Sequence, residues 1–150
     1  MTIQEKIEAD MKEAMRAKEA ERLSVLRMAK SALMNAAIEK YGSGSKLRDP
    51  DSIVVLRKQL KQRQDSIEGF LKGDRKDLAD KERREAEVLA AYLPEQLSEF
   101  QIGQIVQEAI AETGATSRSQ MGAVMRVVTS KAAGRADGKT LSQAVQKVLA

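Results

Sequence analysis

The sequence contains no cysteine, no histidine and no tryptophan, and only 3% of its residues are aromatic. Without cysteine, the chain has no disulfide, no thiol nucleophile and no cysteine-ligated metal. Without histidine, it lacks the side chain that most often moves protons near pH 7 and most often binds metals. These absences exclude several classes of enzyme site, and we expect the protein to hold no cofactor and no metal.

Long apolar runs are also missing. No stretch of about 18 apolar residues is present, so we expect no membrane span. The first residues do not form the apolar core of a secretory signal, because Glu5 and Glu8 interrupt them. We therefore expect a cytoplasmic protein.

Charged residues are abundant and nearly balanced. They make up 32% of the chain, with a net charge of +4. Residues 1–94 hold 20 Lys and Arg against 17 Asp and Glu, and residues 95–150 hold six against five. Neither part is the strong basic block that is typical of nucleic-acid-binding proteins. The different charge densities of the two parts favour two regions with different surfaces.

Apolar residues recur at helical spacing along the whole chain, and no strand alternation is present over a useful length. Breaks are predicted at residues 42–45, at residues 73–74 and at Pro94. Helix starts are indicated by Asp49-Pro50, with Asp49 as the N-cap, and by capping boxes that begin at Thr2, Ser98, Ser117 and Thr140. The sequence thus predicts an all-α fold: a four-helix N-terminal domain (1–94) followed by a compact three-helix C-terminal domain (95–150).

Four methionines lie at helical spacing among alanines and leucines: Met11, Met15, Met28 and Met34. Flexible thioethers can line an adaptable binding groove. A place in the core is the commoner role at such spacing, and we expect these residues to be buried.

Glu82 and Glu85 lie three residues apart on the predicted fourth helix. Helical bundles that bind two metal ions normally combine such carboxylates with histidine, which this chain lacks. We therefore expect this pair to belong to a solvated, charged helix face.

The third predicted helix carries four cations within two turns: Arg57, Lys58, Lys61 and Arg63. No acidic residue lies between Asp51 and Asp65. The simpler interpretation is a solvated face, because the aromatic partners of a single-stranded nucleic-acid site are missing. A secondary nucleic-acid contact is the alternative.

A second group of cations lies in the C-terminal part: Arg126, Lys131, Arg135 and Lys139. The turn from Arg135 to Lys139 precedes a predicted helix start, and the exposed amides of such a start attract anions. Contacts with phosphate groups and a purely structural turn are both compatible with this pattern.

Several segments resemble the YqeY family of small bacterial proteins, in the same order along the chain. The most specific are Tyr92-Leu93-Pro94-Glu95-Gln96-Leu97-Ser98 and Gly134-Arg135-Ala136-Asp137-Gly138-Lys139. The others begin at Glu21, Gln62, Asp77 and Met121, with the sequences ERLSVLRM, QRQDSI, DLADKE and MGAVM.

This resemblance carries expectations about function. The C-terminal part of the family is similar to the tail domain of the B subunit of the tRNA-dependent Asp/Glu amidotransferase, a helical appendage that helps to hold the tRNA. The family is often associated with carbon–nitrogen ligase activity, with glutamine as the amide donor, through that shared domain. This chain has no counterpart of the amidase subunit or of the catalytic body of the B subunit. We expect no catalysis by this chain alone.

Two hypotheses of different classes follow. The first is a tRNA-associating helper that contacts the RNA backbone through Lys131, Arg135 and Lys139. The second is a protein–protein interaction module without a nucleic-acid role, favoured by the near-neutral charge and the zwitterionic fourth helix.

Overall fold

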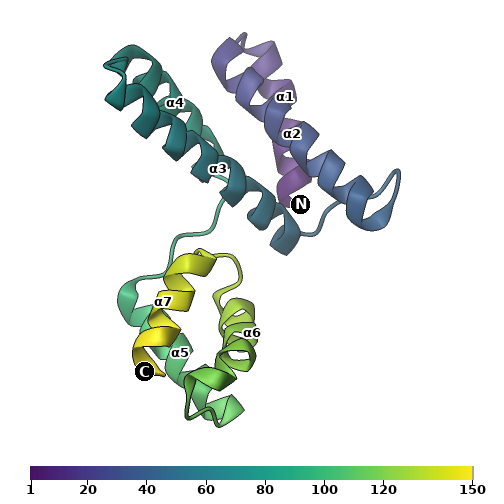
Figure 1. The fold of residues 1–150 in the computed structure, drawn as a ribbon. Helices are drawn as coiled ribbons and strands as arrows, with labels where there is room; N and C mark the ends of the chain where they lie inside the picture. The colour runs from purple at the N-terminus through teal and green to yellow at the C-terminus, as the bar shows by residue number, and fades with distance from the viewer. Residues whose placement is uncertain (150) are drawn as a thin grey trace. The chain divides into compact units, whose positions relative to one another are not determined.

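The computed structural model describes residues 1–149, and within this range every regular element is a helix. Figure 1 shows the order α1 (Ile3–Arg16), α2 (Ala20–Tyr41), α3 (Asp49–Lys72), α4 (Lys76–Ala90), α5 (Glu99–Thr113), the short 3-10 helix η1 (Arg118–Gln120), α6 (Met121–Ala132) and α7 (Gly138–Val148). The predicted all-α fold class is confirmed. None of the helices within residues 1–149 is long and apolar enough to cross a membrane.

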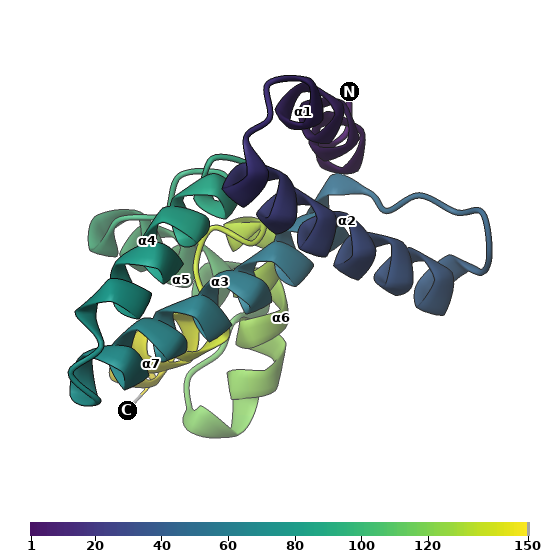
Figure 2. The ribbon, with the colours of Figure 1, turned by 90° about the horizontal axis from the view of Figure 1, so that it is seen from above.

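The chain divides into two compact units, Met1–Leu93 and Pro94–Ala150. In the first unit, α1 packs on α2 and α3 packs on α4, and α2 contacts both helices of the second pair. Figures 1 and 2 both show α3 and α4 side by side as an antiparallel hairpin. The centre of this unit is filled by aliphatic side chains, among them Ile7, Leu26, Leu33, Leu56 and Leu89, all fully buried.

The second unit is built from α5, α6 and α7, which pack on one another around a core of their own. Val106, Val124, Val128 and Val145 are fully buried there. Gly114 ends α5 in the left-handed conformation, with φ 68°. Each unit thus places its apolar stripes against partners within the same unit.

Three of the expected helix starts have their N-caps where the sequence places them: Thr2 for α1, Ser98 for α5, and Ser117 for the 3-10 helix η1 that leads into α6. The Thr2 side chain accepts a hydrogen bond from the Glu5 amide at 3.2 Å. Ser98 and Gln101 form a reciprocal capping box, with bonds of 2.9 and 3.1 Å. These caps satisfy amides that a helix leaves without an intrahelical acceptor.

The predicted cap of α3 is wrong, because Asp49 is the first residue of that helix and Arg48 is its N-cap. The Asp49 carboxylate instead accepts a hydrogen bond from the Ile3 amide, 2.9 Å away at the start of α1. The first amides of α1 need acceptors, and the carboxylate supplied by a distant segment binds one of them.

The predicted start of α7 at Thr140 is also wrong. Helix α7 begins at Gly138, with Asp137 as its N-cap, and the Asp137 carboxylate accepts from the Thr140 amide at 2.7 Å. A carboxylate is favoured over a hydroxyl at this end of a helix because it also interacts with the helix dipole.

The methionines depart from the expected core positions. Met11 is partly buried against the core, but Met15, Met28 and Met34 are 51%, 57% and 42% exposed. Ala29, Leu33 and Ala37 fill the buried face of α2 instead. Alanine, valine and leucine thus take the buried positions of α2, and its methionines stay exposed.

Candidate functional site

Two of the four C-terminal cations meet at one hollow. Arg126 and Lys131 line a cavity of about 370 Å³, together with Glu112, Val127 and Ser130. Four of these five side chains come from α6, and Glu112 comes from the last turn of α5. The hollow therefore combines two cations and a hydroxyl with one carboxylate.

Lys131 is already bound to two carboxylates of α5. Its ammonium lies 2.9 Å from Glu112 Oε1 and 3.3 Å from Glu108 Oε2. These two partners, four residues apart on one helix face, raise the pKa of Lys131 above its ordinary value, Glu112 having the larger effect. An incoming anion at Lys131 must compete with these carboxylates.

The structure assigns Arg135 a contact within the chain. Its Nε donates to the Glu95 carbonyl oxygen at 2.8 Å, and its own carbonyl accepts from the Leu97 amide at 2.9 Å. Because Glu95 and Leu97 belong to the Tyr92–Ser98 segment, the two most specific segments of the sequence bind each other. Arg135 thereby holds the chain that leads into α5.

Lys139 is exposed in the first turn of α7. The side chain of Asp137 binds the Thr140 amide at this helix start, so a carboxylate of the protein itself already occupies part of the predicted anion position. Neither Arg135 nor Lys139 is among the residues that line the hollow of Arg126 and Lys131.

The cations of α3 do not share one environment. Lys58 and Lys61 are exposed and Arg57 is half-buried, but Arg63 is only 9% exposed. Arg63 Nη1 donates to Glu82 Oε2 at 3.2 Å and to Glu85, and Nη2 lies 3.9 Å from the sulfur of Met28. Arg63 therefore lies between helices and outside the expected basic face.

The expectation that Glu82 and Glu85 are solvated is wrong, because their side chains are only 23% and 13% exposed. They face the buried guanidinium across the α3–α4 hairpin, which favours partial burial of all three charges. One sequence signal was available: Arg63 interrupts the apolar seam formed by Ile53, Leu56, Leu60, Ile67 and Leu71. A charge at a seam position indicates a buried partner of opposite charge.

A cleft of about 270 Å³ opens beside this ion cluster. It is lined by side chains of α2, α3 and α4: Met28, Gln59, Gln62, Arg63, Ser66, Glu82 and Glu85. Sequence reasoning did not identify this cleft, although Gln62, Arg63 and Ser66 come from one family-like segment and Glu82 from another. Separate segments meet here only because α3 and α4 fold back on each other.

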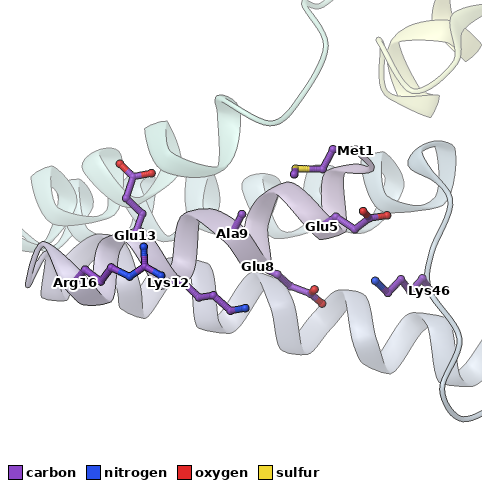
Figure 3. A pocket seen from close by; sticks show the side chains of 8 residues that line it. All are labelled: Met1, Glu5, Glu8, Ala9, Lys12, Glu13, Arg16 and Lys46. Carbon is purple, nitrogen blue, oxygen red and sulfur yellow. The ribbon is translucent and has the colours of Figure 1, made fainter.

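A larger hollow, of about 660 Å³, follows the outer side of α1. Figure 3 shows that both acidic and basic side chains line it, and that Glu8 and Lys46 point toward one another. It contains no hydroxyl nucleophile beside a base. Within residues 1–149, no group of three or more carboxylates could hold a metal ion.

Comparison with known proteins identifies similar chains in fungi. The protein named Altered inheritance of mitochondria protein 41, mitochondrial, from Pyrenophora tritici-repentis is 32% identical over 149 residues, which cover 96% of this chain and 79% of the relative. The proteins of the same name from Lachancea thermotolerans and Kluyveromyces lactis are 36% and 37% identical. These matches cover 58% and 57% of this chain, and 46% and 45% of the relatives.

The expectation of a cytoplasmic protein is contradicted by these relatives, since all three carry the word mitochondrial in their names. That expectation depended on the missing apolar signal core, which argues only against secretion. The family described as Yqey-like protein matches residues 4–149. The chain therefore belongs to the YqeY family, as its sequence segments indicated.

Proposed function

We propose that this protein is a non-catalytic, tRNA-associating helper whose C-terminal unit contacts the RNA backbone. The observation that carries the proposal is the hollow on α6, where Arg126, Ser130 and Lys131 converge. Phosphate oxygens are the usual targets of such side chains. The resemblance of this unit to the tail of the tRNA-dependent amidotransferase gives the class of RNA, and the absence of histidine and cysteine supports a binding role.

The contacts within the chain narrow the set of cations that can bind RNA. Arg126 and Lys139 are exposed, and the described part of the chain shows no acidic partner for either. Arg135 is used inside the unit, so we remove it from the proposed contact. Lys131 contributes only when RNA phosphate displaces Glu112 and Glu108.

The test is a fluorescence anisotropy titration of labelled total tRNA at about 50 and 200 mM salt. Each phosphate contact lowers log K by about 0.7 to 0.9 per decade of salt. With Arg126 and Lys139 as the main cations, we expect a slope of about −1.4 to −1.8. Absence of binding at low salt would overturn the proposal.

Variants make the test specific. Arg126→Ala and Lys139→Ala should each reduce the magnitude of the salt slope by about 0.7 to 0.9. Lys12→Ala on α1 removes the same charge from the other unit and serves as the control. Glu112→Gln frees Lys131 from its nearest carboxylate and should strengthen binding. Unchanged affinity in both Ala variants would remove these residues from the proposal.

A protein–protein interaction module is the second candidate. It is favoured by Phe100, which is 73% exposed in the first turn of α5. The same helix face continues with uncharged, exposed residues: Gly103, Gln104, Gln107 and Ala111. Aromatic side chains are enriched, and charged ones depleted, where proteins contact one another. A partner that is retained after nuclease treatment and lost with Phe100→Ser would support this function, and recovery of RNA alone would contradict it.

A further inference from the structure

The cleft between α2, α3 and α4 has a composition unlike that of the other hollows. It combines a nearly buried guanidinium with two carboxylates, two side-chain amides, a hydroxyl and a thioether. It lies in the N-terminal unit, so the proposed RNA contact does not use it. The residues that line it come from three helices, α2, α3 and α4.

The two terminal nitrogens of the Arg63 guanidinium have hydrogen-bond acceptors of different strength. Nη1 donates to both Glu82 and Glu85. Among residues 1–149, the acceptor of Nη2 is the Met28 sulfur, 3.9 Å away. A thioether is a weak acceptor, and a buried donor normally has a good one. One side of a guanidinium that lines the cleft is therefore available to an oxygen acceptor of a ligand.

The carboxylates leave room for a cation. One guanidinium faces two carboxylates, and Lys81, the other cation nearby, lies 3.8 Å from Glu85 Oε1. The second oxygen of Glu82 has no cationic partner in the described part of the chain. The cleft thus offers a donor for a carboxylate and an acceptor for an ammonium group within one small volume.

We propose that this cleft binds a small zwitterion of the α-amino acid class. The ligand carboxylate accepts from Arg63 Nη2 in place of Met28, and the ligand ammonium donates to Glu82. The side-chain amides of Gln59 and Gln62 supply neutral donors and acceptors. The Ser66 hydroxyl, which donates to the Gln62 carbonyl oxygen at 3.1 Å, supplies an acceptor. A volume of about 270 Å³ lies just under the range of pockets for drug-sized ligands, which suits a ligand with few non-hydrogen atoms.

Ligands with a single charge fit this arrangement less well. An anion would add a third negative charge beside Glu82 and Glu85, which like-charge repulsion opposes. A simple amine would leave Arg63 Nη2 with its weak acceptor. Both charges are therefore needed on the same molecule.

The experiment is a titration of the ¹⁵N-labelled full chain at pH 7, followed by NMR at the side-chain amides of Gln59 and Gln62. The probes are L-norvaline, pentanoate and butylamine, which share a chain and differ in charged groups. We expect norvaline to bind with a Kd of the order of 1 mM, and the other two at least tenfold more weakly. No shift with norvaline at about 20 mM, or equal binding of butylamine, would overturn the proposal.

Variants separate binding from folding. Glu82→Gln keeps the size of the side chain and leaves Glu85 to hold Arg63, and it should weaken norvaline binding at least tenfold. Glu87→Gln, on the exposed side of α4, is the matched control. Met28→Leu removes the competing sulfur and should leave norvaline binding intact or strengthen it. Equal binding to Glu82→Gln and the unaltered protein would refute the assigned ammonium contact.

Discussion

At the residue scale, single carboxylates connect segments that are distant in sequence or separated by loops. Asp49 binds the first amide of α1, and Asp51 binds both Lys40, at 2.8 Å, and the Tyr41 hydroxyl, at 3.0 Å. Tyr92 donates in the same way to Asp10, and burial, followed by this hydrogen bond, raises the pKa of Tyr92. In each case an acid of one helix fixes the end of another.

Asp51 makes the stability of the N-terminal unit depend on pH. The hydrogen bonds from Lys40, first, and Tyr41 hold the pKa of Asp51 below its ordinary value, which is about 3.9. The folded state therefore binds fewer protons than the unfolded chain as the carboxylate titrates. The contribution of Asp51 is complete above the ordinary pKa and is lost as the pH falls through the lowered one.

We predict that Asp51→Asn lowers the free energy of unfolding at pH 7, and that this difference is smaller at about pH 3, below the ordinary pKa of an aspartate. Urea denaturation at the two pH values measures it. Asp65→Asn, at an exposed residue of α3, is the control and should have little effect at either pH. A deficit of Asp51→Asn that is as large at the lower pH as at pH 7 would argue against the titration.

At the element scale, the helix starts show which signals the local sequence carries. Thr2 and Ser98 cap their helices with their own side chains, as the local pattern predicts. Helix α7 starts earlier than its pattern predicts, because the Asp137 carboxylate three residues before Thr140 provides the cap. Helix α3 has Arg48 as its N-cap and no side-chain cap, because the Asp49 carboxylate binds the Ile3 amide of α1 instead. A capping box in the sequence identifies a possible helix start. The side chain that accepts from the first amides of the helix decides where the helix begins.

The competition at α7 gives a second prediction. Asp137→Ala removes the acceptor of the Thr140 amide and should destabilise the protein by about 1 kcal/mol. Thr140→Ala keeps this cap and should stay within about 0.5 kcal/mol of the unaltered protein. Urea denaturation of the two variants measures both effects. A larger loss with Thr140→Ala would restore Thr140 as the cap.

At the scale of the whole molecule, each unit has a core of its own. The core of the C-terminal unit consists of residues from Leu97 to Leu149. The Arg135 contacts with Glu95 and Leu97 also lie within this unit. These facts favour independent folding of the C-terminal part.

We therefore predict that residues 94–150, produced alone, fold into a helical domain. Its unfolding free energy should stay below about 5 kcal/mol, because a core in so short a chain is small. Circular dichroism during heating and the dispersion of the NMR spectrum test this. A spectrum of a disordered chain would contradict it, and a folded domain would allow RNA binding to be measured without the first unit.

The sequence by itself determined the all-α class, the helices and their approximate limits, because these depend on local periodicity, turn residues and Pro94. It also carried the segments that place the chain in the YqeY family. Only the tertiary structure decided which charges meet. The sequence predicts Arg63 on a basic face, but the side chain is buried against Glu82 and Glu85. It predicts Lys131 and Arg135 as phosphate contacts, but both side chains bind other groups of the same chain. The environment of a charge depends on neighbours brought near by packing, and helical periodicity does not specify them.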